Sequence, residues 1–147
     1  MTMKLYISKD STSLAVGADK LARAVEAAAQ KRGLTVEIVR TGSRGAYWLE
    51  PMVEIERDGV RYGYGPLAPE EVEGVLAGGD HAKALGPVDE IDWLRQQQRL
   101  IYARCGVIDP LSLDDYEKHG GGKGLKRAIA LGGAATVKEV LDSGLRG

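Results

Sequence analysis

The sequence of 147 residues contains no phenylalanine, one cysteine and two histidines, and its aromatic content is only 5%. A single thiol cannot form an internal disulfide, and it cannot alone hold a structural zinc ion or an iron–sulfur cluster. The core therefore has to be built from leucine, valine, isoleucine and alanine, which bury little area per residue. We expect a small protein that depends on neighbours for part of its stability.

An excess of one charge is also missing, because 20 basic residues face 21 acidic ones and the net charge is -1. A domain that binds nucleic acid needs a clustered basic surplus, so we expect no nucleic-acid partner. No apolar run approaches the roughly 18 residues of a membrane-spanning helix, and residues 1–10 lack the pattern of a secretory signal. We expect no membrane partner and a cytoplasmic location.

The first half of the chain alternates between strand and helix patterns. Residues 4–8 and 35–40 alternate apolar and polar side chains, which predicts two strands. Between them, residues 13–32 repeat apolar side chains at helical spacing, and Gly33 supplies the stop. We predict one long helix there.

A hairpin and a second helix follow. Asp58-Gly59 separates two alternating runs, residues 52–57 and 60–64, and this dipeptide is a strong hairpin signal. Pro69 with acidic residues after it predicts the start of a helix within residues 67–77. Residues 1–79 are thus predicted to form a two-layer α/β domain with helices on one face of the sheet.

The second half shows no strand pattern. Glycines and Pro87 mark residues 80–89 as a linker, and residues 90–147 are predicted to be a small all-α segment. We expect helices over residues 90–104 and 123–131, and two more that begin at the N-caps Ser112 and Thr136.

Few residues suggest chemistry. Cys105 lies at the predicted end of a helix, where the dipole disfavours a thiolate, so we favour a buried structural role over a nucleophile. His81 and His119 have no companions at metal-ligand spacing. The glycine run at 119–124 lacks the pattern of a phosphate-binding loop and is interpreted as a connection between helices. We predict no catalytic residue and no metal ligand in this segment.

The loop at residues 43–51 is a candidate partner-binding surface. Arg44, Tyr47 and Trp48 are of the residue types that dominate interaction hot spots. A loop folded over its own core explains the same residues, and the sequence leaves both readings open.

Residues 99–116, 124–131 and 142–147 carry a resemblance to a known family. The first of these reads Arg-Leu-Ile-Tyr-Ala-Arg-Cys-Gly-Val-Ile-Asp-Pro-Leu-Ser-Leu-Asp-Asp-Tyr. Together they resemble the N-terminal entry into the NADH-binding flavoprotein subunit shared by respiratory complex I, NAD-reducing hydrogenases and NAD-dependent formate dehydrogenases. The resemblance implies that Gly147 is the first residue of an incomplete FMN- and NAD-binding loop.

Residues 4–77 resemble the thioredoxin-like ferredoxin domain that accompanies this family. That domain binds a [2Fe-2S] cluster through two pairs of cysteines, and the matching positions here are Ser8, Ser13, Ser43 and Tyr47. A hydroxyl is a poor ligand for an iron–sulfur core, which prefers thiolates. The resemblance therefore implies a thioredoxin-like, ferredoxin-type domain without metal.

A cluster-free thioredoxin-like domain ahead of a flavoprotein domain is similar to the beta subunit of soluble, molybdenum-containing NAD-dependent formate dehydrogenases. In such an enzyme, electrons pass from formate through iron–sulfur clusters and FMN to NAD. The similarity implies an inactive N-terminal segment without cofactors that docks onto the iron–sulfur gamma and molybdenum-containing alpha subunits. FMN, [4Fe-4S] and NAD are implied for the complete subunit. The alternatives are a freestanding protein-interaction module, or the equivalent subunit of an NAD-reducing hydrogenase or of complex I.

Overall fold

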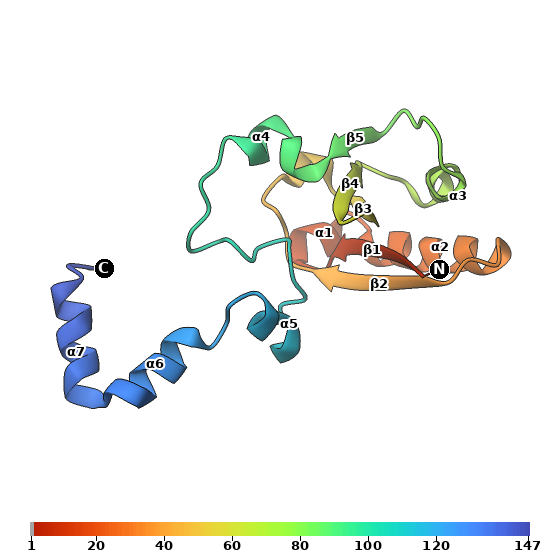
Figure 1. Cartoon of the computed structure of the whole chain (residues 1–147). Coiled ribbons are helices and arrows are strands. Elements are labelled where there is room, and N and C mark those ends of the chain that lie inside the picture. Colours follow the sequence, from red (N-terminus) through yellow and green to blue (C-terminus); the bar gives the residue numbers. More distant parts are fainter. Residues whose placement is uncertain (1) are drawn as a thin grey trace. The chain divides into compact units, whose positions relative to one another are not determined.

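A computed structural model describes residues 2–147 (Figure 1). The chain divides into two compact units between Pro110 and Leu111. The first unit holds all five strands of the described residues, and the second holds helices α5 to α7.

The first unit is built on one sheet with the strand order β2-β1-β3-β4-β5. Strand β1 is parallel to β2, whereas the pairs β1–β3, β3–β4 and β4–β5 are antiparallel. A parallel β-α-β unit followed by an antiparallel hairpin and a helix is the thioredoxin-like arrangement, so the predicted fold is confirmed. The strands are β1 (Met3–Ser8), β2 (Val36–Thr41), β3 (Val53–Arg57), β4 (Val60–Tyr64) and β5 (Ala84–Pro87).

The helix predicted over residues 13–32 is in fact two helices. Helix α1 (Ser11–Ala15) begins at Asp10, whose carboxylate accepts hydrogen bonds from the amides of Thr12 and Ser13. Helix α2 (Ala18–Lys31) begins at Gly17, where φ is +104°. Glycine adopts this left-handed conformation readily, and it interrupts the helix between α1 and α2. The apolar spacing continues on both sides of the interruption, so periodicity alone predicted one helix.

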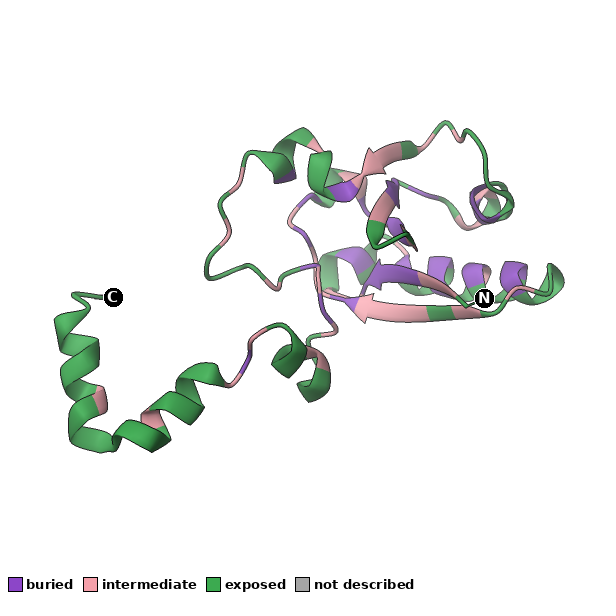
Figure 2. Ribbon diagram, viewed as in Figure 1, coloured by how far each residue is buried: buried purple, intermediate pink, exposed green. Residues whose placement is uncertain are grey.

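The core lies between α2, the short helix α3 (Val72–Ala77) and one face of the sheet (Figure 2). Alternate residues of β1 and β3 and one stripe of α2 supply its largest members, each contributing about 1.5–3 kcal/mol on full burial. A turn of 3-10 helix, η2 (Pro69–Glu71), leads into α3, as the proline and acidic residues predicted. The most buried side chains of this core include Leu5, Ile7, Leu21, Val25, Val53, Ile55 and Val72.

The turn between β3 and β4 confirms the hairpin signal. Asp58 and Gly59 have φ values of +51° and +78°, so both adopt the left-handed conformation of a tight two-residue turn. The turn sets the register in which Ile55 lies opposite Tyr62.

The stretch expected to be a linker contains strand β5. Its residues pair with β4, with Pro87 opposite Tyr62 and Gly86 opposite Gly63. A four-residue strand containing glycine and proline carries no alternating pattern, so its existence depends on tertiary pairing. The first compact unit extends through β5 to Pro110.

The helix expected over residues 90–104 is mostly absent. Only η3 (Val88–Glu90) and α4 (Asp92–Arg95) form, and turns follow. Leu100 and Ile101 are 90% and 83% exposed, so no buried face stabilises a helix there.

The second unit is all-helical, and residues 90–147 contain no strand, as predicted. Helix α5 (Leu113–Lys118) begins at Ser112, whose hydroxyl accepts from the Asp115 amide at 3.1 Å. Helix α6 (Lys123–Leu131) has the predicted bounds, and α7 (Gly133–Asp142) follows. Thr136 is not an N-cap, because α7 starts three residues earlier and the Thr136 hydroxyl donates to the Gly132 carbonyl.

Candidate functional site

Ser8 and Ser13 meet at the end of β1 and the start of α1. The Ser13 hydroxyl donates a hydrogen bond to the Ser8 hydroxyl, with 2.9 Å between the oxygens, and both side chains are buried. Asp10 lies between them in the sequence, and its carboxylate accepts from the Ser8 hydroxyl at 3.3 Å. Strand, turn and helix therefore place three oxygen-bearing side chains together.

Glu50 brings a buried carboxyl group to the same place from another loop. It is 9% exposed and accepts a hydrogen bond from the Met52 amide at 3.1 Å. Burial raises the pKa of Glu50; the Met52 amide and the Ser13 side chain oppose that rise, and the charges of Asp10 and Glu54 add to it. We call Ser8, Asp10, Ser13 and Glu50 the polar cluster.

The second pair of matching positions lies outside this polar cluster. The Ser43 hydroxyl accepts from the amide of Gly45 at 2.9 Å, within its own loop. Tyr47 belongs to the 3-10 turn η1 (Tyr47–Leu49) and is 54% exposed. Within residues 2–147, no hydrogen bond joins Ser43 or Tyr47 to the polar cluster.

These residues do not fit an iron–sulfur cluster. The four matching positions carry three hydroxyls and a phenol, whereas an iron–sulfur cluster needs thiolates. Two of the hydroxyls are hydrogen-bonded to each other instead of being held apart around a metal core. The part of the chain that the structure describes holds no group of three or more histidine, cysteine, aspartate or glutamate side chains suited to a metal ion.

An exposed aromatic surface lies next to η1. The indole rings of Trp48 and Trp93 meet edge to face, with centroids 5.5 Å apart, and they are 57% and 51% exposed. We call Tyr47, Trp48 and Trp93 the aromatic patch. Exposed tryptophan and tyrosine are typical of interaction hot spots. Trp93 was missed by sequence analysis because only folding brings it to Trp48.

Arg44 does not belong to the aromatic patch. Its side chain is 8% exposed, and its guanidinium donates to the two carboxylate oxygens of Glu54 at 2.6 and 2.9 Å. Burial acts to lower the pKa of Arg44, but the hydrogen bonds and charge of Glu54 outweigh it and the pKa is raised. The residue is therefore bound to the sheet instead of being presented to a partner.

The segment 105–110, which we call the strap, is held against the sheet of the first unit. Arg61 donates to the carbonyls of Gly106 and Val107 at 3.4 and 2.8 Å. Lys9 and Asp109 form an ion pair at 3.2 Å, and Ile108 is buried. These contacts fix a segment whose sequence carries the family resemblance.

The other candidate residues named from the sequence do not come together in one site. Cys105 is exposed and follows a series of turns, so the prediction of a buried thiol at a helix end was wrong. His81 accepts from the Lys83 amide, and His119 caps α5 beside the Asp115 carbonyl. Residues 119–124 join α5 to α6, and Gly147 is exposed beyond α7.

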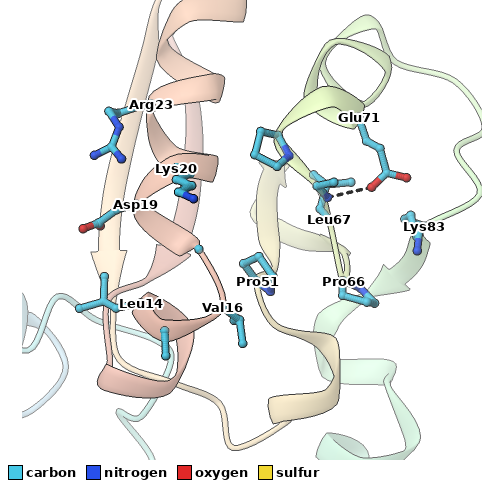
Figure 3. A pocket seen from close by; sticks show the side chains of 14 residues that line it. Leu14, Val16, Asp19, Lys20, Arg23, Pro51, Pro66, Leu67, Glu71 and Lys83 are labelled. Carbon is cyan, nitrogen blue, oxygen red and sulfur yellow. Dashed lines mark hydrogen bonds between the residues drawn. The ribbon is translucent and has the colours of Figure 1, made fainter.

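A groove of about 600 Å³ lies between α2 and the segment 66–71 (Figure 3). Pro51 and Pro66 line it together with Leu14, Val16 and Lys20. Sequence analysis missed this groove because its walls come from segments far apart in the chain. Across residues 2–147, the helices are too short or too polar to cross a lipid bilayer.

Comparisons with known proteins find a likeness among solved structures. No family model matches the sequence, and no curated protein matches it. A solved structure similar to this chain is the thioredoxin-like [2Fe-2S] ferredoxin from Aquifex aeolicus, at 21% sequence identity and a TM-score of 0.44. The alignment covers 60% of this chain and 92% of the ferredoxin.

Proposed function

We propose that this chain is the N-terminal structural and subunit-docking segment of an oxidoreductase subunit in the NADH-binding flavoprotein family. The observation that carries the proposal is the hydrogen bond between Ser8 and Ser13. It joins helix α1 to the end of β1 in a sheet of thioredoxin-like topology, at the positions that match the first cysteine pair of the resembled ferredoxin domain. An electron carrier that has lost its ligands keeps a shape with which it can bind other subunits.

The strap and the helices after it support the same assignment. Residues 99–116 carry the resemblance to the flavoprotein entry, and the strap within them is tied to the first unit by Arg61 and Lys9. The strap, which lies within the resembled segment, is thereby held by the docking domain itself. We assign the aromatic patch as its contact with another subunit, because three exposed aromatic side chains gain most when they are buried.

Within this proposal the enzyme is an NAD-dependent formate dehydrogenase complex. FMN, [4Fe-4S] clusters and NAD belong to the complete subunit, and the iron–sulfur gamma and molybdenum-containing alpha subunits are the partners. The 147-residue segment is inactive by itself. The equivalent subunit of an NAD-reducing hydrogenase or of complex I has the same layout, and the electron donor distinguishes these enzymes.

Iron content tests the loss of the cluster. We expect the chain, expressed with iron and sulfide available, to fold and to purify without stoichiometric iron or the visible absorption of a [2Fe-2S] centre. A variant with Ser8→Cys, Ser13→Cys, Ser43→Cys and Tyr47→Cys, compared in the same preparation, shows whether the scaffold still accepts a cluster when thiolates return. Stoichiometric iron in the unmodified chain would refute the proposal.

Purification of the intact complex tests the docking role. We expect Trp48→Ala to reduce recovery of the partner subunits, whereas Val60→Ala, an exposed apolar residue of β4 outside the aromatic patch, leaves recovery unchanged. NAD reduction with formate and with hydrogen, measured on the same material, identifies the electron donor.

A freestanding interaction module is the second candidate, and the Trp48–Trp93 pair favours it because both rings are more than half exposed within residues 2–147. The two candidates differ in what is purified with the chain. A freestanding module is recovered with a partner that is neither a flavoprotein nor a molybdenum enzyme, whereas the docking segment is recovered with a flavoprotein and a molybdenum-containing subunit.

A further inference from the structure

The groove beside α2 has an apolar floor that is open to solvent. Leu14 and Val16 are 40% and 50% exposed, and Pro51 lies between α2 and Pro66, which belongs to the opposite wall (Figure 3). Its volume of about 600 Å³ lies within the roughly 300–1,000 Å³ of ligand clefts. Covering these side chains removes apolar surface from water, at roughly 25 cal/mol per Å².

Three cationic side chains line the same groove. Lys20 and Arg23 come from α2 and Lys83 from the segment before β5. Among residues 2–147, none of the three has an ion-pair partner.

The two carboxylates that line the groove are already engaged. Asp19 pairs with Arg40 at 2.7 Å, and Glu71 accepts from the Ala68 amide at 2.8 Å. The amide leaves the charge of Glu71 in place, so three cations face one carboxylate that has no cationic partner among residues 2–147, and the groove presents a positive surplus above an apolar floor.

We infer that this groove docks an extended acidic segment of a partner polypeptide. Carboxylates of that segment pair with Lys20 and Lys83 on the two walls, and an apolar side chain between them covers Leu14 and Val16. A phosphate backbone fits less well, because three cations with two carboxylates among them do not form the basic track that nucleic acid requires. The inference goes beyond the proposed function, since the groove is separate from the aromatic patch and needs no flavoprotein.

Selection from a library of random dodecapeptides, displayed on phage and captured by the full chain, provides the probe. We expect the enriched peptides to combine aspartate or glutamate with an apolar residue. A fluorescent copy of the most enriched peptide then measures affinity by anisotropy. Lys20→Gln, Arg23→Gln and Lys83→Gln together are expected to weaken peptide binding about tenfold, because each ion pair at a partly exposed site changes the affinity by less than tenfold.

The matched control neutralises three exposed cations outside the groove, with Arg32→Gln, Lys118→Gln and Lys126→Gln. It has the same net charge as the groove variant and is expected to bind the peptide as the unmodified chain does. Leu14→Ser should weaken binding several-fold without changing charge. Circular dichroism checks that each variant is folded.

Three results would overturn the inference. The first is a lack of aspartate and glutamate among the enriched peptides. The second is equal affinity of the groove variant and the control variant for the fluorescent peptide. The third is displacement of that peptide by heparin as strong as by the unlabelled peptide, which would mark a general polyanion surface. Iron content and subunit recovery are measured separately, so failure here is distinguishable from failure of the proposed function.

Discussion

The Ser13 hydroxyl donates to the Ser8 hydroxyl across 2.9 Å, and this bond ties the first turn of α1 to the end of β1. In the resembled ferredoxin domain, the matching positions carry thiolates. Glu50, from the loop that precedes β3, lies beside Ser13 in the same polar cluster and accepts a hydrogen bond from the Met52 amide of its own loop. The loop after β1 and the loop before β3 thus share one buried polar cluster.

Glu50 should make the stability of the first unit depend on acidity. Its pKa is raised in the folded chain, first by burial, so the folded state holds the proton at pH values where the unfolded state has released it. Stability therefore falls as the pH rises from about 4.5 through the raised pKa, and it is regained on acidification. We expect Glu50→Gln to remove this part of the pH dependence.

Urea unfolding across this pH range measures the effect as the difference between variant and unmodified chain. Glu26→Gln is the control, because Glu26 is exposed on α2. Equal pH profiles for Glu50→Gln and the unmodified chain would show that the carboxyl is not held in the environment described.

Local signals in the sequence were enough for much of the fold. Asp58-Gly59 predicted a turn because only two left-handed residues close such a hairpin, and Ser112 predicted a cap because its hydroxyl satisfies a free amide. The core could also be predicted locally, because the apolar side chains of β1 repeat with the period of a strand and those of α2 with the period of a helix.

The parts that failed depend on contacts between distant segments. Strand β5 exists because β4 offers an unpaired edge, and the helix expected over residues 90–104 does not continue beyond α4 because nothing buries Leu100. Arg44 was interpreted as a surface anchor, since its pairing with Glu54 depends on the register of the sheet. Only Ser8 and Ser13 of the polar cluster were singled out from the sequence, because no pattern in the sequence links Glu50 to Ser13.

The Arg44–Glu54 pair is expected to be a strong single contact in the first unit. Both side chains are buried, but each keeps a longer ion pair at 3.5 Å when the other is removed, Glu54 with Arg61 and Arg44 with Asp89. We therefore expect Arg44→Met or Glu54→Gln alone to destabilise the chain by less than the roughly 3–5 kcal/mol of a buried charge left without any partner. The double variant should cost less than the sum, and a double-mutant cycle in urea measures the coupling.

The exposed pair Lys31–Glu73 is the matched control, because its distance of 2.6 Å is as short but both side chains are open to solvent. Lys31→Met with Glu73→Gln is expected to change the free energy of unfolding little. Similar coupling in the two cycles would contradict the role given to burial.

Gly106 is the point at which the strap packs against Arg44 in the loop after β2. A Cβ atom there would lie 2.1 Å from Cγ of Arg44, and φ is +75°. We expect Gly106→Ala to cost about 1–3 kcal/mol through crowding and to loosen residues 105–110, which hydrogen exchange of their amides detects. Gly124→Ala, in α6 with open space around it, is the control and should strengthen its helix by up to about 1 kcal/mol. Unchanged protection of the strap in Gly106→Ala would show that it is not held through this contact.

Tyr6 should make the chain sensitive to strong alkali. Burial and the hydrogen bond that its hydroxyl donates to Glu56 raise the pKa of Tyr6 from 10.0 to about 12, although the nearby charge of Arg61 opposes the shift. Below pH 10 the phenol is neutral in both folded and unfolded chains, so its contribution is complete. Between pH 10 and about 12 the unfolded chain ionises first, and stability is lost as the pH rises.

Ultraviolet titration of tyrosinate provides the measurement, with Tyr6→Phe and Tyr102→Phe compared with the unmodified chain. One of the six tyrosines should titrate late, near pH 12, and only Tyr6→Phe should remove that step, because Tyr102 is 68% exposed. Tyr6→Phe also leaves Glu56 without its donor while the ring stays beneath the guanidinium of Arg61, whose central carbon lies 3.3 Å from the ring centroid. The variant should therefore stay folded, and its stability should fall less steeply between pH 10 and 12. A late step that survives in Tyr6→Phe would assign it to another tyrosine and remove the basis for the alkaline sensitivity.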